Sequence, residues 1–381
     1  MRHDYLMSET DIAGGGALAL TSGDRSVLRG RFLYREPMKK HVSWRAGGAA
    51  QRAYVPADLE DLAWLVRSVP AHEPIHMVGL GSNLLVRDGG VGGVVILMHG
   101  VLTRIAVESR IQGLPPAPPG QENSALVYAE VGVAAPKLAR FAANHDLVGG
   151  EFWAGIPGTV GGAIAMNAGC YGMDTWDKLV QVLTLDREGR LNERLPNEYT
   201  IGYRHVALKQ GDARPPPNPP PHAGEGTNVM PKPMASPPHP NPLPQAGEGA
   251  NVGLRPPTPI NEWFIGGWFR LLKGDGRASR ETIKELLTRR IASQPLKLPN
   301  AGSIFRNPPG DFAARLIESC GLKGARIGNA QVSEKHANFI VNLGGATASD
   351  IERLIEHVED TVEARTNVRL LREVRIIGER Q

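Results

Sequence analysis

A run of small residues between positions 149 and 172 constrains the fold more than any other part of this chain. From Ala154 to Gly172 it reads AGIPGTVGGAIAMNAGCYG. A buried strand would need larger apolar side chains, whereas glycine in such a run marks a close approach of a ligand or another backbone. A tightly packed turn is the alternative, but a turn would not require Asn167 or a repeated Gly-Gly pair. The run therefore predicts a backbone surface that accepts a large, flat ligand.

A second glycine-rich segment, Gly79–Gly90, reads GLGSNLLVRDGG and follows a short apolar run. Its glycines would let backbone N–H groups turn toward an anion, and Ser82 and Asn83 add further donors. The segment does not match the G-x-G-x-x-G dinucleotide fingerprint, because Leu84 occupies the third glycine position and no helix pattern follows. It is a candidate phosphate-binding loop, with an ordinary tight β-turn as the alternative.

The remaining pattern indicates an α+β fold without regular alternation of strands and helices. Strands are expected at 75–79, 94–98, 126–133, 179–185, 263–272 and 368–377. Helices are expected at 58–69 with Asp58 as cap, from Pro136 onward, at 279–291 with Ser279 as cap, and at 350–365 with Ser349 and Glu352 as a capping box. In the third helix the side chains expected to be buried are Ile283, Leu286, Leu287 and Ile291.

Composition excludes several classes of protein. The net charge is only +4 and no basic block is present, so no nucleic-acid partner is expected. The two cysteines, Cys170 and Cys320, lack a CxxC spacing, which excludes a disulfide framework and a zinc ribbon. The 11 histidines include no HExxH motif, so no metal site is expected. No segment approaches the ~20 apolar residues of a membrane span, and the chain is expected to be cytoplasmic.

Residues 211–259 differ from the rest of the chain, because sixteen of the 31 prolines lie there. The segment also repeats itself: NPPPHAGEGTNV at 218–229 returns as NPLPQAGEGANV at 241–252. Two copies without apolar faces cannot build a solenoid. The composition predicts a disordered insertion. A smaller loop of the same kind is expected at 112–123, and a loose leader at 1–30.

Together, the two glycine-rich segments resemble the FAD-binding region of the UDP-N-acetylenolpyruvoylglucosamine reductases. Other matches to this family are SWRAGG at Ser43–Gly48, Tyr203-Arg204, GSIFRNP at Gly302–Pro308, the run Gly321–Asn338, and LLREVRIIG at Leu370–Gly378. The resemblance covers about residues 32–210 and 260–379. It implies a two-subdomain FAD-binding fold of the vanillyl-alcohol-oxidase/PCMH type with a C-terminal α+β substrate-binding domain. It also implies the shorter type of reductase, without a tyrosine-bearing loop.

The resemblance implies domain bounds as well. After the leader, the first FAD-binding subdomain would span 31–100 and include the final strand at 368–381. The second subdomain would span 101–275 and contain the insertion. The substrate-binding domain would span 276–367.

The activity implied is reduction of UDP-N-acetylglucosamine enolpyruvate to UDP-N-acetylmuramate in peptidoglycan precursor synthesis. FAD would be bound non-covalently and NADPH would supply the electrons. Ser303 would be the proton donor, while Arg204 and Glu373 would bind and polarise the substrate carboxylate. From position alone, Ser303 could equally be a helix or turn cap, Arg204 a surface cation, and Glu373 a solvent-facing strand residue. An oxidase of the same superfamily and a non-catalytic relative are the competing interpretations, and a monomer is expected.

The resemblance also names binding residues. For FAD they are Trp44, Arg45, Gly47, Gly79, Gly81, Ser82, Asn83, Leu84, Gly155, Ile156, Pro157, Gly158, Gly161, Gly162, Ala163, Asn167 and Gly169. For the substrate they are Tyr203, Lys273, Asn307 and His336, with Arg270 competing with Lys273 for the diphosphate. The chain departs from the family pattern at Val206 (often serine), at Asn300-Ala301 (often Gly-Gly) and at Arg306 (often lysine).

Overall fold

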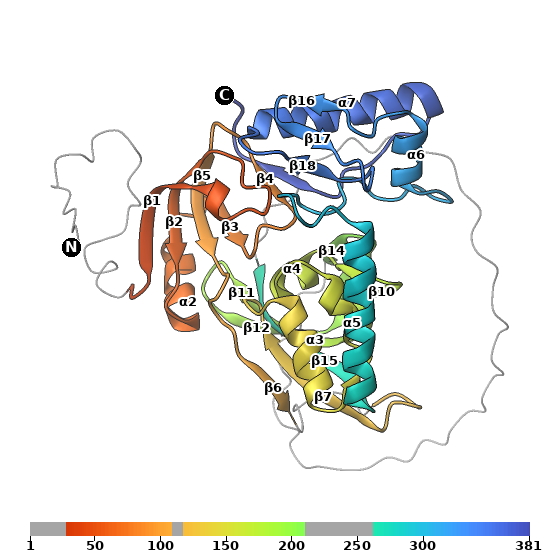
Figure 1. Cartoon of the computed structure of the whole chain (residues 1–381). Coiled ribbons are helices and arrows are strands. Elements are labelled where there is room, and N and C mark those ends of the chain that lie inside the picture. Colours follow the sequence, from red (N-terminus) through yellow and green to blue (C-terminus); the bar gives the residue numbers. More distant parts are fainter. Residues whose placement is uncertain (1–27, 109–116, 210–261) are drawn as a thin grey trace, which may run out of the picture. The chain divides into compact units, whose positions relative to one another are not determined.

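The computed structural model describes residues 28–108, 117–209 and 262–381 (Figure 1). The expected insertion, nearly all of the leader and the first part of the loop at 112–123 lie outside the described residues. The described chain up to Leu208 and from Glu262 onward belongs to one contact-defined unit.

A four-stranded sheet begins the described chain. Its order is β1 (Arg31–Pro37), β2 (Ala49–Val55), β5 (Val91–Leu97) and β3 (Ile75–Val78). β1 is antiparallel to β2, whereas β2 and β3 both run parallel to β5. Helix α2 (Leu59–Ser68) packs on this sheet through Leu62 and Leu65. Its N-cap is Asp58, whose side chain accepts a hydrogen bond from the Asp61 N–H, as the sequence predicted.

A second, six-stranded sheet holds the middle of the chain. Its members are β12 (Leu191–Arg194), β11 (Leu179–Asp186), β15 (Glu262–Lys273), β7 (Ser124–Glu130) and β6 (Ile105–Glu108), with β8 (Leu147–Val148) beside β15. The helices packed with it are α3 (Ala135–Asn144), α4 (Val160–Ala165) and α5 (Gly276–Ser293). Pro136 lies in the first turn of α3, as predicted. From this sheet α5 runs toward the C-terminal elements (Figure 1).

The C-terminal part has its own apolar core. Its elements are α6 (Ala313–Ser319), β16 (Arg326–Ile327), β17 (Ala330–Val332), β18 (Ile340–Asn342) and α7 (Ala348–Thr366). The chain then returns to the first sheet region, where β19 (Arg375–Ile377) pairs in parallel with β4 (Leu84–Val86). This pairing brings the end of the chain beside the glycine-rich segment Gly79–Gly90.

Two short hairpins and four 3-10 turns complete the fold. The hairpins are β9 (Gly169–Cys170) with β10 (Met173–Asp174), and β13 (Tyr199–Gly202) with β14 (His205–Leu208). The turns are η1 (Met38–Lys40), η2 (Glu151–Gly155), η3 (Thr175–Asp177) and η4 (Pro196–Glu198).

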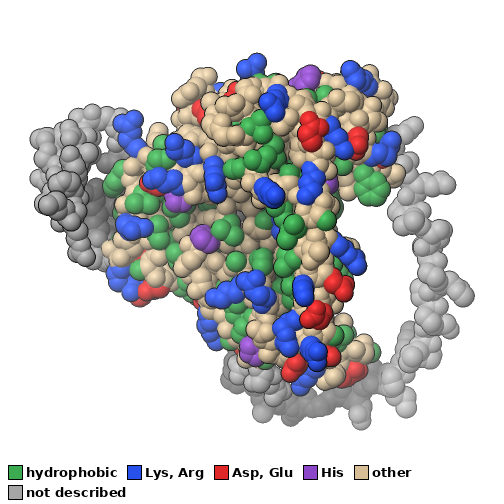
Figure 2. All heavy atoms as spheres, in the orientation of Figure 1, with side chains coloured by type: hydrophobic (Ala, Val, Ile, Leu, Met, Phe, Trp, Pro, Cys, Tyr) green, Lys and Arg blue, Asp and Glu red, His purple; other side chains and the backbone are tan. Residues whose placement is uncertain are grey.

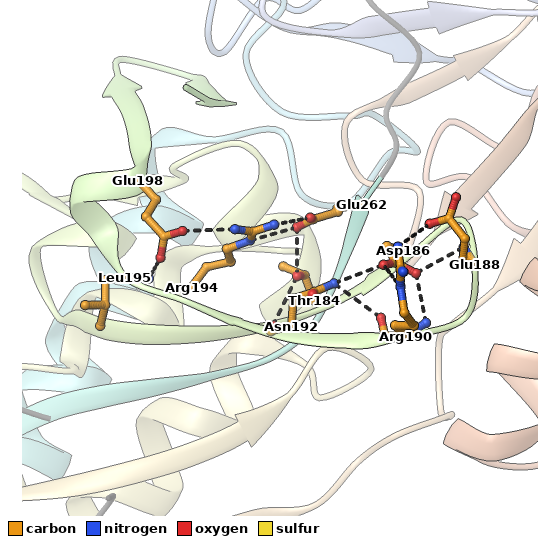
Figure 3. Close-up of polar contacts among 9 residues, drawn as sticks. All are labelled: Thr184, Asp186, Glu188, Arg190, Asn192, Arg194, Leu195, Glu198 and Glu262. Carbon is orange, nitrogen blue, oxygen red and sulfur yellow. Dashed lines mark hydrogen bonds and ion pairs between the residues drawn. The ribbon is translucent and has the colours of Figure 1, made fainter. Parts of the chain in front are cut away.

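An ion-pair network fixes the strand that follows the proline-rich segment (Figure 3). The Arg194 guanidinium lies between two carboxylates and donates to Glu262 at the start of β15 and to Glu198 in η4. The Thr184 hydroxyl adds a 2.9 Å hydrogen bond to Glu262. Because η4 leads directly into β13, this network joins the strands on both sides of the proline-rich segment.

Three predictions about helix details are wrong. Helix α5 is capped by Asp275, and the buried Ser279 instead donates its hydroxyl to Glu151 Oε1 at 2.6 Å. The capping box of α7 is Thr347 with Asp350, because the same spacing of hydroxyl and carboxylate occurs two residues before the predicted pair. Ile291 is 63% exposed, since the last turn of α5 extends beyond the core that buries Ile283.

Candidate functional site

Both glycine-rich segments and the three predicted catalytic residues line one cavity of about 370 Å³, here named cavity 1. The sequence-predicted residues in its lining are Gly79, Gly81, Ser82, Asn83, Leu84, Gly155, Ile156, Pro157, Gly158, Gly162, Ala163, Gly169, Arg204, Ser303 and Glu373. These residues come from five separate stretches of the chain, at 79–84, 155–169, 204, 303 and 373. The β4–β19 pairing, the β13–β14 hairpin and the segment after α5 bring them together.

The glycines of cavity 1 serve two purposes. A Cβ at Gly79 would approach Thr159 Oγ1 to 2.5 Å, and a Cβ at Gly81, whose φ is +58°, would collide with the backbone of His41. These two glycines therefore allow the loops to pack against one another. At Gly158 an added Cβ would crowd Ser82 Oγ at 3.2 Å, whereas at Gly162 the nearest atom is 3.8 Å away, so space remains beside that backbone. Of the glycines in the two glycine-rich segments that line cavity 1, only Gly162 fits the predicted close approach of a ligand.

Arg204 and Glu373 form the charged centre of cavity 1. Arg204 lies at the turn of the β13–β14 hairpin with φ +53°, a left-handed conformation that is costly for a non-glycine residue. Its Nε donates to Glu373 Oε1 at 2.6 Å. Its Nη1 and Nη2 donate to the carbonyls of Asn167 and Gly169, each at 3.2 Å. The small-residue run from Ala154 to Gly172 therefore orients the guanidinium.

The Glu373 side chain is only 11% exposed and forms an ion pair with Arg204. Burial raises the pKa of Glu373 above its ordinary value of 4.5, while Arg204 acts in the opposite direction. The Glu373 N–H donates to the Ile304 carbonyl at 2.7 Å, which joins this residue to the segment containing Ser303. A carboxyl group that accepts a proton more readily than usual thus lies beside a fixed cation.

Ser303 follows Gly302, whose φ is +78°. The next two residues are held by Asn338: the Ile304 N–H donates to its carbonyl, and the Phe305 N–H donates to its side-chain Oδ1. Within the described part of the chain, the Ser303 hydroxyl makes no hydrogen bond to another residue. This geometry does not support a capping role and leaves the hydroxyl free to act on a ligand in cavity 1.

Five predicted FAD residues do not line cavity 1, and Arg45 is one of them. Trp44 is fully buried in the C-terminal core, where its indole N–H donates to the Ile340 carbonyl at 2.8 Å. Gly47 and Gly161 are packed closely against Val86 and Val131. Asn167 is buried and accepts the Trp176 N–H at 3.1 Å. These residues position the loops around the cavity.

The predicted substrate residues also lie outside the lining of cavity 1. Tyr203 packs its ring beside the Arg204 guanidinium, with 5.4 Å from Cζ to the ring centroid. Asn307 Oδ1 accepts the Ala313 N–H at the start of α6. His336 packs against Phe339, and burial lowers its pKa. Lys273 ends β15, where its N–H donates to Asn123. Arg270 lies on the same strand and reaches Ser124 Oγ at 3.5 Å.

Sequence reasoning missed several residues of the site. Cys170, Arg290 and Arg375 line cavity 1. Burial raises the pKa of the Cys170 thiol, which keeps it protonated. Arg290 was not singled out because α5 reads as an ordinary charged surface helix. The informative signal was its place in the last turn of that helix, just before the segment that carries Ser303.

The described residues contain no group of three or more His, Cys, Asp or Glu side chains that could hold a metal ion. None of their helices is both long enough and apolar enough to cross a membrane.

Two family models match separate parts of the chain. The family model of the FAD binding domain matches residues 50–193. The model of the UDP-N-acetylenolpyruvoylglucosamine reductase C-terminal domain matches residues 294–377. The expected α+β fold, with an FAD-binding domain and a separate C-terminal domain, is thereby confirmed.

Relatives match along nearly the whole chain. UDP-N-acetylenolpyruvoylglucosamine reductase of Thiobacillus denitrificans is 68% identical over 381 residues, which is 100% of both chains. The enzyme of Nitrosomonas eutropha is 48% identical over 93% of this chain and 91% of its own. The solved reductase from Thermus caldophilus superposes with a TM-score of 0.62 at 26% identity, covering 92% of this chain and 99% of that one. This chain belongs to the UDP-N-acetylenolpyruvoylglucosamine reductase family, as an FAD-binding oxidoreductase.

Proposed function

We propose that this protein reduces the enolpyruvyl group of UDP-N-acetylglucosamine enolpyruvate to the lactyl ether of UDP-N-acetylmuramate, a step of peptidoglycan precursor synthesis. FAD, bound non-covalently, is the cofactor and NADPH is the electron donor. The observation that carries the proposal is the meeting of Ser303 and the Arg204–Glu373 pair in the cavity lined by both glycine-rich segments. The substrate, the cytoplasmic location and the monomeric state are parts of the proposal.

The residues of cavity 1 fit a flavin nucleotide. Space remains beside the backbone at Gly162 and Gly302, and the side chains of Ser82 and Asn83 offer polar groups to a phosphate. Ser82, Asn83 and the backbone from Gly155 to Gly158 would hold the cofactor. When bound, FAD supplies the hydride that adds to the terminal vinyl carbon of the substrate.

Hydride addition leaves negative charge on the neighbouring carbon and its carboxylate. Arg204 is fixed by three hydrogen bonds and binds this carboxylate as the charge develops. Ser303 then donates its proton to the carbon beside the carboxylate. A serine hydroxyl is a weak acid in water, so the neighbouring cation must support loss of the proton. Glu373 keeps the guanidinium in place between turnovers.

The second candidate is an oxidase of the same superfamily. The fixed Arg204–Glu373 pair and the free Ser303 hydroxyl favour the reductase, because its reaction passes through an anionic intermediate that must accept a proton. The test is NADPH oxidation by the purified protein with and without the enolpyruvyl substrate, under air and under nitrogen. The reductase oxidises NADPH in proportion to added substrate, and equally under both gases. Rapid NADPH-independent oxygen consumption would contradict the proposal.

A further inference from the structure

Arg306 joins the three stretches of chain that carry the catalytic residues. It lies three residues after Ser303 and does not line cavity 1. Its Nη2 donates to the Arg204 carbonyl at 3.1 Å, although the two residues are 102 positions apart. Its backbone N–H donates to the Leu371 carbonyl at 2.8 Å, two residues before Glu373. Through these two contacts the Ser303 segment is tied to both members of the Arg204–Glu373 pair.

The hairpin turn that carries Arg204 needs contacts of this kind. Its left-handed φ of +53° costs free energy in a non-glycine residue. On one side of the turn, the Asn167 side-chain amide donates to the Gly202 carbonyl at 3.2 Å. On the other side, Arg306 donates to the Arg204 carbonyl. The bonds from the Arg204 guanidinium fix its side chain, whereas Arg306 fixes its backbone.

Arg306 occupies this place at a cost. Its Nε is buried and has no hydrogen-bond partner among the described residues. Within the same part of the chain, Arg306 forms no ion pair with an acidic side chain. A buried donor without an acceptor lowers stability. A contribution to folding alone therefore explains this arginine poorly.

Cations outnumber carboxylates around the site. Among the described residues that line cavity 1, Glu373 is the only carboxylate, whereas Arg204, Arg290 and Arg375 all line it. Figure 2 shows Lys and Arg side chains with few acidic ones across the middle of this face, between the first sheet and the C-terminal elements. Arg306 adds a further positive charge beside the pair without lining the cavity. A surplus of this kind favours the ionised form of a carboxyl group.

The groups that act on the Glu373 carboxyl come from three elements. Arg204 and Tyr203 belong to the hairpin turn, Arg306 follows Ser303, and Arg375 lies in β19. Burial raises the pKa of Glu373, and the positive charges of Arg204 and Arg306 oppose this rise. Burial raises the pKa of the Tyr203 phenol, as does the Glu373 charge, so the phenol stays neutral. Removal of the Arg306 charge would therefore raise the pKa of Glu373 further.

We propose that Arg306 is a positioning residue for the substrate-dependent half-reaction, which holds the backbone of Arg204 through its carbonyl and keeps Glu373 ionised through its charge. The proposal rests on the proposed function. Arg306 acts through these two residues and not on the substrate. Lysine, which often occupies this position in the family, keeps the charge but lacks the planar set of donors.

The test separates the charge of Arg306 from its effect on folding. R306Q removes the charge, and R306K keeps it. R353Q is the matched control, because it removes one exposed arginine from α7 in the same C-terminal part of the chain. For each FAD-loaded protein, stopped-flow flavin absorbance gives the rate of reduction by NADPH. It also gives the limiting rate of reoxidation by the enolpyruvyl substrate against pH.

In R306Q we expect the limiting rate of reoxidation to fall about tenfold, because Arg204 loses a backbone contact. The acidic limb of the pH profile should move to higher pH by at least about half a pH unit. R306K should keep this limb and recover the rate to within about threefold of wild type. R353Q should match wild type in both. FAD content and flavin reduction by NADPH should stay at wild-type values in all three.

The double variant R306Q/E373Q tests whether the charge acts through Glu373. It should show no acidic limb, because the group that titrates is absent. Loss of FAD in R306Q, or equal slowing of its two half-reactions, would overturn the proposal and assign Arg306 to stability. An unmoved limb in R306Q, or a moved limb in R306K, would also overturn it. Failure of the substrate to reoxidise the reduced wild-type flavin would instead refute the proposed function, so the two failures are distinguishable.

Discussion

At the scale of single residues, the site depends on side chains held by distant parts of the chain. Arg204 and Glu373 are 169 positions apart. The left-handed conformation of Arg204 and the burial of Glu373 both cost free energy, which the surrounding contacts offset. Strain and burial of this kind are typical of residues placed for chemistry. The roles of these residues lead to two predictions.

Replacement of Ser303 by alanine should separate the two half-reactions. NADPH reduces the flavin without protonating a substrate carbon, so that step survives. Reoxidation of the reduced flavin by the enolpyruvyl substrate should slow by roughly 10²–10⁴-fold, because a positioned proton donor is lost. Stopped-flow flavin absorbance follows each step separately. Reoxidation of the S303A protein at the wild-type rate would show that Ser303 is not the acid.

The second residue-scale prediction concerns pH. Ionised Glu373 holds Arg204, and burial raises the pKa of this carboxyl above 4.5. The substrate-dependent half-reaction should therefore lose rate as pH falls through an apparent pKa above 4.5, because protonation weakens the pair. In E373Q the amide oxygen still accepts from Arg204 but cannot titrate, so this acidic limb disappears. The measurement is the rate of flavin reoxidation against pH for both proteins, and an unchanged acidic limb in E373Q would contradict the argument.

At the scale of elements, the spacing of apolar residues and the turn residues predicted which helices and strands exist. They predicted less well the residues at which each one begins and ends. Strand β15 was expected at 263–272 and is found at Glu262–Lys273. Helix caps were harder, because a hydroxyl followed three residues later by a carboxylate occurs twice before α7, at Thr347 and at Ser349. Tertiary contacts decide between the two: Glu352 accepts hydrogen bonds from Arg87 at 2.8 Å and 2.9 Å, which removes it from any capping role.

This correction gives a matched pair of variants. Thr347→Ala should lower the free energy of unfolding by about 1 kcal/mol, because the Asp350 N–H loses its side-chain acceptor. Ser349→Ala should change it by less than about 0.5 kcal/mol. Urea denaturation of the FAD-loaded proteins measures both. A larger loss in S349A than in T347A would restore the cap predicted from the sequence.

At the scale of the whole molecule, the sequence indicated the two glycine-rich segments and the fold class, but not how the parts interlock. Trp44 belongs to the SWRAGG motif and was predicted to bind FAD, yet the folded chain buries it against Ile340 of the C-terminal core. Asp88, within the glycine-rich segment Gly79–Gly90, accepts hydrogen bonds from the N–H groups of Ala348 and Ser349 at the start of α7. Local patterns contain no information about such long-range partners. For the same reason, the composition of α5 did not reveal that Arg290 lines cavity 1.

The last prediction concerns the proline-rich segment, whose residues 210–261 lie outside the described structure. Its two ends are fixed by contacts that do not involve it: Leu208 pairs with Tyr199, and Glu262 pairs with Asp186 and accepts from Arg194 and Thr184. Loop-closure entropy changes by only about 0.6 kcal/mol for each doubling of length. Deletion of residues 214–256 should therefore leave FAD content and NADPH turnover close to the wild-type values.

Arg194→Gln supplies the contrast for this deletion, because it breaks the anchor while keeping the whole segment. The side chains of Arg194 and Glu262 are 18% and 17% exposed, so loss of the cation leaves a mostly buried carboxylate without its main partner. We expect R194Q to destabilise the protein by roughly 1–3 kcal/mol, more than the deletion does. Thermal unfolding of the three FAD-loaded proteins ranks them. If the deletion proves the more destabilising change, the segment itself contributes to the fold, and its ends are not independently anchored.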